Sequence, residues 1–226
     1  MSFELTQLRE VAEKYRYHDA GTHGVYSRLV LERRSESPIA RLDDAAEFLG
    51  KWKALRFKGG KTAFRRICTT WLRKNLTDLQ HLQGRVLYSL APNDFQHILS
   101  ITSSFRDCGA PPTTYGKALH FFLPETVMPW DQAIVRNTYK LRSDPESFAS
   151  YQHFGWKLLH HATRGKAIKA LEQIERDHAR SIGYFEPMTM NLDHLAFFPK
   201  LSARAVAALG GPSKAFSDDL SVLSDS

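Results

Sequence analysis

The chain has 226 residues, of which 42% are hydrophobic, 24% charged and 12% aromatic, and its formal net charge is +7 at pH 7. This apolar content excludes a mostly disordered chain, because it is enough to bury a sizeable core. No stretch approaches the roughly 18 uncharged apolar residues of a membrane span, and two cysteines are too few for a disulfide scaffold. We therefore expect a cytoplasmic protein without membrane contact, with a single domain over residues 1–212 and a flexible polar tail over 213–226.

Apolar residues recur at intervals of three and four along most of the chain, which is the spacing of amphipathic helices. These apolar stripes run over residues 5–15, 45–55, 64–71, 79–90, 95–102, 148–162 and 168–182. Gly59–Gly60 is expected to separate the second helix from the third. Asn93 or Asp94 can cap the fifth helix, and Asp144–Pro145 is a strong start for the sixth. A last short helix is expected from Ser202 to a Gly-Gly pair.

Strand signals are weak throughout the sequence. Residues 24–33 suit a strand and a helix equally, and there is no series of alternating runs joined by tight turns. The chain also has no internal repeat and no low-complexity tract. The predicted fold class is therefore all-α.

One segment carries the whole basic excess of the chain. Residues 51–74 hold nine Lys or Arg and no Asp or Glu, so the remaining residues together carry a net charge of −2. Aromatic residues are interleaved with these cations, at Trp52, Phe57, Phe64 and Trp71. This pattern favours a nucleic-acid partner, because each neutralised phosphate releases condensed counterions. The alternative is a solvated basic helix face.

The segment 109–135 contains the candidate chemistry. Pro111–Pro112 are expected to end the preceding helix, a new helix to begin near Lys117, and the next one at Asp131. A lysine amine at a helix start suits a nucleophile, and an aspartate there can activate water or stabilise a sugar cation. Both groups are useful for breaking an N-glycosidic bond. The alternatives are a simple N-cap for Asp131 and a surface position for Lys117.

The stretch YGKALHFFLPETVMPWDQAIV resembles the catalytic segment of the helix–hairpin–helix DNA glycosylase superfamily, in particular the oxoguanine-excising branches. Gly116–Lys117 is similar to the Gly-Lys pair that opens the second hairpin helix in those enzymes. Pro129–Trp130–Asp131 is similar to their Pro-Val-Asp-type element. The sequence departs from the family in two respects: the usual Leu-Pro-Gly-Val-Gly hairpin is absent, and only 14 positions separate the lysine from the aspartate.

The resemblance implies a helical enzyme with two lobes around a cleft, which extrudes a modified base from double-stranded DNA and cleaves its N-glycosidic bond. Asp131 would be the catalytic aspartate, and Lys117 would match the lysine nucleophile, whose Schiff base adds strand cleavage. Contact with the extruded base would come from Trp130, His120 and Tyr115. The residues expected to bind the DNA backbone are Thr113, Thr114 and Gly116 in the hairpin, and Arg56, Lys58, Lys61, Arg65 and Arg66 around Gly59–Gly60.

No cofactor and no metal site are predicted, because none of the ten histidines falls in a known ligand spacing. No protein partner is implied. Divergence from the standard repair hairpin suggests a specialised role besides DNA repair, such as antiviral defence by excision of a hypermodified viral base like glucosylated hydroxymethylcytosine. One alternative is a non-enzymatic basic helical protein that binds DNA or RNA. Another is a helical protein–protein module whose basic block faces an acidic partner.

Overall fold

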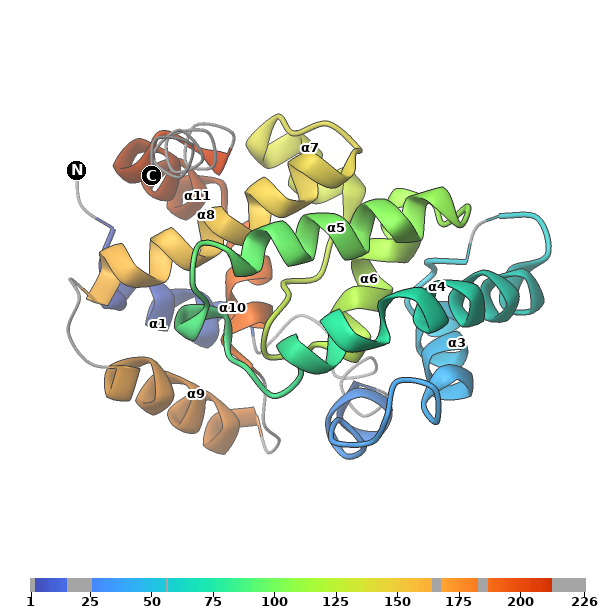
Figure 1. Cartoon of the computed structure of the whole chain (residues 1–226). Coiled ribbons are helices and arrows are strands. Elements are labelled where there is room, and N and C mark those ends of the chain that lie inside the picture. The colour runs from blue at the N-terminus through green and yellow to red at the C-terminus, as the bar shows by residue number, and fades with distance from the viewer. Residues whose placement is uncertain (1–2, 16–25, 56, 164–167, 183–186, 213–226) are drawn as a thin grey trace.

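The computed structural model of the protein describes residues 3–15, 26–55, 57–163, 168–182 and 187–212. Within these ranges the regular structure is helical and no strand occurs, which confirms the all-α class (Figure 1). The elements are α1 (Leu5–Tyr15), the π-helical turn η1 (Ser27–Leu31), α3 (Leu42–Lys51), α4 (Gly60–Leu82), the 3-10 turn η2 (Leu87–Ser89), α5 (Asp94–Asp107), α6 (Pro112–Phe122), α7 (Gln132–Tyr139), α8 (Pro145–Thr163), α9 (Ile168–Ile182), α10 (Met188–Leu195) and α11 (Pro199–Leu209). The tail expected over 213–226 lies outside the described residues. None of the helices in the described ranges has the length and apolar character needed to cross a bilayer.

Several helix boundaries match the sequence signals that predicted them. Asp144 caps α8, because its carboxylate accepts the backbone N–H of Ser147 at 2.7 Å and the helix begins at Pro145. This side-chain oxygen satisfies an N–H group that has no partner within the helix. Helix α5 begins at Asp94 as expected, but the side chain of Asn93 makes no capping bond, and the Asp94 carboxylate accepts the N–H of Ala91, which precedes the helix, at 2.6 Å. The predicted start of α5 is therefore confirmed, whereas the predicted side-chain cap is not formed.

Other boundaries differ from the prediction. The apolar stripes over residues 64–71 and 79–90 belong largely to one helix, α4. No helix-breaking residue separates the two stripes, and the helix ends shortly before Gly84, whose φ is +76°. The last helix begins at Pro199 instead of Ser202, whose hydroxyl bonds back to the carbonyl of Leu195 at 2.7 Å. Residues 26–31 are helical, so the strand considered for 24–33 does not form in its described part. The helix α10 was not predicted.

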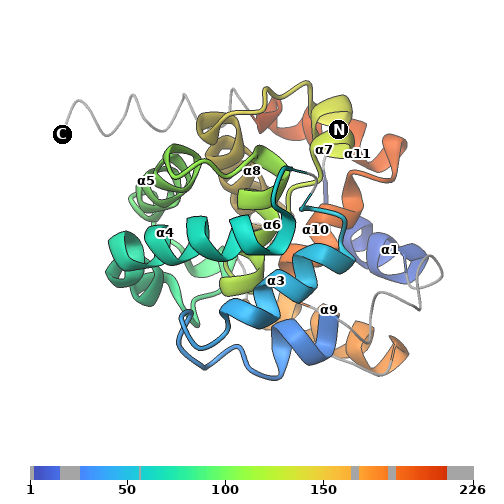
Figure 2. The ribbon, with the colours of Figure 1, turned by 90° about the vertical axis from the view of Figure 1, so that its right-hand side faces the viewer.

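Helix α6 lies at the centre of the core. Its residues from Thr114 to Phe122 are all buried, and α3 and α5 both pack against it. Figure 2 shows α6 in the middle of the molecule, surrounded by other helices. Gly116 allows α6 to pack closely against the segment before α7, because a Cβ atom built at this position would lie 2.4 Å from Cβ of Trp130. The absence of a side chain at Gly116 therefore sets the distance between α6 and the start of α7.

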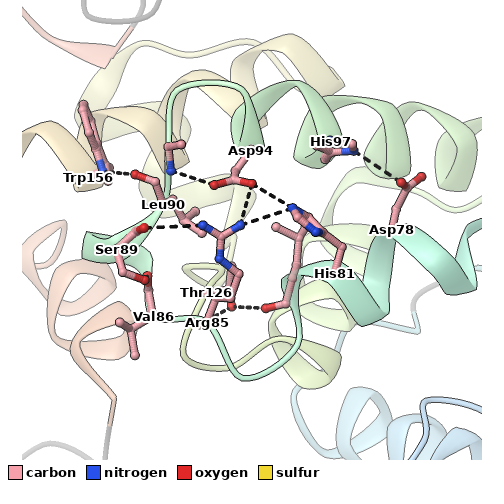
Figure 3. A network of polar contacts seen from close by, with 12 residues as sticks. Asp78, His81, Arg85, Val86, Ser89, Leu90, Asp94, His97, Thr126 and Trp156 are labelled. Carbon is pink, nitrogen blue, oxygen red and sulfur yellow. Dashed lines mark hydrogen bonds and ion pairs between the residues drawn. The ribbon is translucent and has the colours of Figure 1, made fainter.

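A polar network joins the end of α4 to the start of α5 (Figure 3). Arg85 Nη1 donates to Oδ1 of Asp94 at 2.7 Å, and His81 Nε2 lies 3.1 Å from the same oxygen. Burial opposes the charge of Asp94, but the hydrogen bonds from Ala91, Arg85 and His81 lower the pKa of that carboxyl below its usual range. Trp156 Nε1 donates to the carbonyl of Leu90 at 3.0 Å. These contacts hold the connection between the two helices against α8.

Glu175 makes the stability of the protein depend on pH. Its side chain is buried in α9, where Oε1 accepts the backbone N–H of Met188 at 2.7 Å, and burial raises its pKa from 4.5 to about 7. The neutral form therefore stabilises the fold below pH 4.5, and this stabilisation is lost as the pH rises through 7. The difference between the unfolded-state pKa of 4.5 and the folded-state pKa of about 7 corresponds to a loss of up to about 3 kcal/mol in the free energy of unfolding at pH 8.

We expect Glu175→Gln to remove this pH dependence, because a neutral amide oxygen can still accept the N–H of Met188. At pH 8 the variant should be more stable than the native protein by up to about 3 kcal/mol, and at pH 4.5 the two should differ little. Urea unfolding at both pH values measures the difference. Glu13→Gln, at an exposed position of α1, is the control and should not alter the profile. The prediction would be contradicted if the free energy of unfolding changed with pH to the same extent in the native protein and in Glu175→Gln.

Candidate functional site

A cavity of about 670 Å³ lies where the first turns of α6, the helix α7 and the connection between α3 and α4 meet. This volume is within the range of pockets that hold small-molecule ligands, roughly 300–1,000 Å³. The lining residues are Trp52, Lys53, Ala54, Phe57, Pro111, Thr113, Thr114, Lys117, Asp131, Arg136 and Asn137. The wall thus combines two aromatic rings, three cations, one carboxylate and several neutral polar groups.

Lys117 and Asp131 meet at this cavity. Nζ of Lys117 lies 3.4 Å from Oδ2 of Asp131 and 3.2 Å from the carbonyl oxygen of Trp52. The same Nζ is 5.6 Å from the centroid of the Trp52 ring. The lysine side chain is 11% exposed and the aspartate side chain 35% exposed, so the carboxylate is the more accessible of the two groups.

The helix that carries Lys117 begins earlier than predicted. Helix α6 starts at Pro112, which makes Lys117 its sixth residue and places it in the second turn. The influence of a helix N-terminus falls off within the first turn, so the dipole does not act on this amine as expected. The second proline of the pair opens the helix because its fixed φ and missing N–H suit the first helical position.

Asp131 does stand at a helix start. Helix α7 begins at Gln132, and the backbone carbonyl of Asp131 accepts the N–H of Val135 at 2.9 Å. The predicted position of this carboxylate, at the N-terminus of the helix after Pro129–Trp130, is therefore confirmed. Free N–H groups of the first turn favour a negative charge at this point.

The expected hairpin residues belong to the first turn of α6. Thr113 and Thr114 both line the cavity, but the Thr114 hydroxyl donates to the carbonyl of Ala54 at 2.6 Å. This bond fastens the connection after α3 to α6. Gly116 is buried against Trp130 and presents no surface to DNA. The turn between α5 and α6 lies instead over residues 108–111.

The three residues expected to contact a base lie in the core. Trp130 and His120 are 0% exposed and Tyr115 is 1% exposed, and none of them lines the cavity. His120 uses both ring nitrogens internally, since Nδ1 lies 2.6 Å from the carbonyl oxygen of Val127 and Nε2 lies 2.8 Å from the hydroxyl of Tyr26. We therefore correct their assignment from base contact to packing, because Tyr115 and His120 lie in the buried part of α6, and Trp130 is buried against that helix in the segment before α7.

Sequence reasoning missed most of the cavity wall. Trp52 and Phe57 were noticed only as aromatics within the basic segment, and Arg136 and Asn137 carried no signal beyond lying in the helix after Asp131. Lys53 also lines the cavity, with a left-handed backbone φ of +52° that is unusual for a residue with a side chain. Unusual backbone conformations of this kind cluster at functional sites.

The basic segment continues directly from the cavity wall. Lys58, Lys61, Arg65 and Arg66 are all exposed, whereas Arg56 lies outside the described residues. Arg65 is engaged by an ion pair, with Nε 2.7 Å from Oδ1 of Asp43. Within the described part of the chain, Lys61 and Arg66 form no ion pair. The charged side chains of Lys61 and Arg66 therefore lie on the exposed surface of α4, which follows the α3–α4 connection that lines the cavity.

The sequence predicts that this basic surface binds nucleic acid. On that prediction, we expect the double charge reversal Lys61→Glu with Arg66→Glu to weaken DNA binding and to lower the slope of log K against log salt by about 2, or about 1 per lost phosphate contact. Fluorescence anisotropy over a series of salt concentrations measures both quantities. The control is Lys200→Glu with Arg204→Glu on α11, where the two side chains are also exposed. An unchanged slope in the first variant, or an equal change in the control, would contradict this assignment of the basic surface.

No group of three or more His, Cys, Asp or Glu side chains is arranged to hold a metal ion within the described ranges. Comparisons of the chain with protein-family models, with curated proteins and with solved structures found no match. Function is therefore inferred from the cavity and its surroundings.

Proposed function

We propose that the protein is a DNA glycosylase of the helix–hairpin–helix type, with two helical lobes, which extrudes a modified base from double-stranded DNA and cleaves its N-glycosidic bond. The observation that carries the proposal is the pairing of Asp131 and Lys117, with 3.4 Å between Nζ and Oδ2, in the wall of a cavity that adjoins an exposed basic segment. A base-excising enzyme needs these three parts together: a reactive carboxylate, room for a base and cations for phosphates.

Asp131 is the group that we assign to the chemistry. Positive charge develops on the sugar as the glycosidic bond breaks, and a carboxylate held in place beside the sugar stabilises that charge. The same carboxylate can accept a proton from an attacking water molecule. Its 35% exposure at the cavity wall supports this assignment, because both roles require access to the substrate.

The remaining lining residues suit a nucleotide. Trp52 and Phe57 offer aromatic faces for stacking, and Asn137 and Thr113 offer hydrogen bonds to a polar edge. Lys53 and Arg136 are exposed cations that can neutralise phosphates near the extruded nucleotide. The cavity has the volume of pockets that hold ligands much larger than a plain pyrimidine, which favours a bulky base such as glucosylated hydroxymethylcytosine and an antiviral role.

The test is a screen for base release. Duplexes that carry damaged bases and duplexes that carry hypermodified viral bases are incubated with the protein, and alkali then reveals abasic sites as strand breaks. Release of damaged bases would assign the protein to repair, and release of glucosylated bases would assign it to defence. Salt-dependent binding without any release would contradict the proposal and favour a basic helical DNA- or RNA-binding protein without chemistry.

A further inference from the structure

We infer that Lys53 binds the phosphate of the nucleotide that occupies the cavity, and that the chain keeps a lysine at this position at a cost in stability. This inference rests on the proposed function for the identity of the ligand, a nucleotide extruded from DNA. The experiment below uses a free nucleotide, so that the inference and the proposed function can fail separately.

The turn that ends α3 holds Lys53 in an unusual backbone conformation. The N–H of Lys53 donates to the carbonyl of Gly50 at 3.3 Å, and the N–H of Ala54 donates to the carbonyl of Leu49 at 2.8 Å. These two bonds form a Schellman motif, in which the left-handed residue after the helix is usually glycine. Lys53 occupies that position, with a φ of +52°. Glycine would therefore suit the turn better, because a residue with a Cβ atom loses free energy in the left-handed conformation.

Hydrogen bonds to α6 fix the backbone on both sides of Lys53. The carbonyl oxygen of Trp52 accepts a hydrogen bond from Nζ of Lys117 at 3.2 Å. The carbonyl oxygen of Ala54 accepts one from the hydroxyl of Thr114 at 2.6 Å. All of these residues line the cavity. Because its two neighbours are held against α6, the backbone of Lys53 is fixed and its side chain remains at the cavity wall.

The side chain of Lys53 has no role within the fold that would offset the cost of its conformation. It is exposed, and within the described ranges it makes no hydrogen bond and no ion pair. Lys140 is also exposed and left-handed, with a φ of +57°, but it does not line the cavity. The conformation alone therefore does not mark a site, and the position of Lys53 at the cavity is what distinguishes it from Lys140.

The charges of the cavity wall favour an anionic ligand. Asp131 is the one carboxylate among the described lining residues, and it lies 3.4 Å from Nζ of Lys117. Lys53 and Arg136 are both exposed and form no ion pair within the described part of the chain. Two such cations beside the two aromatic rings of the wall suit a ligand that has both a ring and an anionic group. A nucleotide has both.

Calorimetric titration of the native protein at low ionic strength is the first experiment. The probes are the common deoxynucleoside monophosphates, each compared with the nucleoside that lacks the phosphate and with inorganic phosphate alone. We expect the best monophosphate to bind at least about tenfold more tightly than its nucleoside, because a hydrogen bond to a charged group is gained. Inorganic phosphate alone should bind at least as weakly as the nucleoside, because it has no ring to place against the aromatic wall.

The second experiment separates the stability of the turn from the binding of phosphate. Lys53→Gly relieves the left-handed conformation, so we expect Tm to rise by roughly 2–4 °C, while the affinity for the best monophosphate falls by about tenfold. Lys53→Arg retains both the cation and the backbone cost, so affinity should stay within about threefold of the native value and Tm should not rise. Lys140→Gly is the matched control, in which Tm should rise without any loss of affinity.

The outcomes distinguish the inference from the proposed function. The inference would be overturned if no monophosphate bound, if inorganic phosphate bound as tightly as the nucleotides, or if the advantage of the monophosphate persisted in Lys53→Gly. An equal fall in affinity in Lys140→Gly would overturn it as well. Nucleotide binding that depends on Lys53, without base release from any duplex, would overturn the proposed function and leave the phosphate contact standing. Base release together with binding that depends on Lys53 supports both.

Discussion

If the proposed function holds, we expect Asp131→Asn to abolish base release, by at least about 1,000-fold, and to leave DNA affinity within about twofold of that of the native protein. The amide has the size and shape of the carboxylate, so the start of α7 and the cavity are preserved. It carries no negative charge, however, and therefore neither stabilises the sugar cation nor takes a proton from water. The substitution also removes the negative charge that lies 3.4 Å from Nζ of Lys117, although the amide oxygen can still accept a hydrogen bond.

Single-turnover release from the best duplex in the screen measures the chemical step, and anisotropy measures affinity for the same duplex. Asp107→Asn is the matched control, because this aspartate is exposed at the end of α5 and does not line the cavity. Full activity of Asp131→Asn would remove the carboxylate from the mechanism and, with it, the assignment of the site. A parallel loss of affinity and activity would instead indicate that Asp131 serves binding.

We expect Gly116→Ala to destabilise the protein by about 3 kcal/mol, which is at the upper end of what overpacking a core costs and corresponds to a fall in Tm of roughly 6–12 °C. The added methyl group would lie 2.4 Å from Cβ and 3.1 Å from Cγ of Trp130, and 3.3 Å from a ring carbon of Phe148. A Cβ atom is tied to its backbone and cannot rotate away. Helix α6 and the segment before α7 must therefore move apart.

The same displacement separates the two functional groups, since Lys117 follows Gly116 and Asp131 follows Trp130. We expect base release to fall even at temperatures where the variant remains folded. Gly50→Ala is the matched control, because an added Cβ there meets only the flexible end of Lys61, at 3.1 Å, and alanine favours a helix over glycine by up to about 1 kcal/mol. Thermal unfolding of Gly116→Ala at the native Tm would contradict the close approach of α6 and Trp130.

Local patterns predicted elements better than they predicted the site. The apolar stripes of α1, α3 and α9, and the starts of α5, α7 and α8, follow from residues next to each other in the chain. The start of α6 was misplaced because Pro111–Pro112 reads both as the end of one helix and as the beginning of another. Helix α10 escaped prediction because Thr189, Asn191 and Asp193 alternate with apolar residues and so show no helical period, and all of its residues are buried.

The assignment of aromatic residues failed for the same reason. Within α6, a run of buried residues from Thr114 to Phe122 offers no periodic signal that separates a cavity face from a core face. His120 and Tyr115 therefore looked as available to a ligand as Lys117. The aromatic residues at the cavity are Trp52 and Phe57. Trp52 precedes Lys117 by 65 positions, and no local sequence pattern extends over such a separation.

By itself, the amino-acid sequence determined the helical class, most helix ranges, the concentration of positive charge before and within α4, and the carboxylate at the start of α7. These properties depend on hydrophobic periodicity, caps and charge, which act over a few neighbouring residues. Only the tertiary structure decided which side chains share the cavity, because its wall is assembled from the connection that contains residues 52–54 and Phe57, from the beginning of α6 and from the beginning of α7 with Asp131. The packing of α3 and the segment before α7 against α6 brings these three segments together, and that packing depends on contacts between residues far apart in the chain.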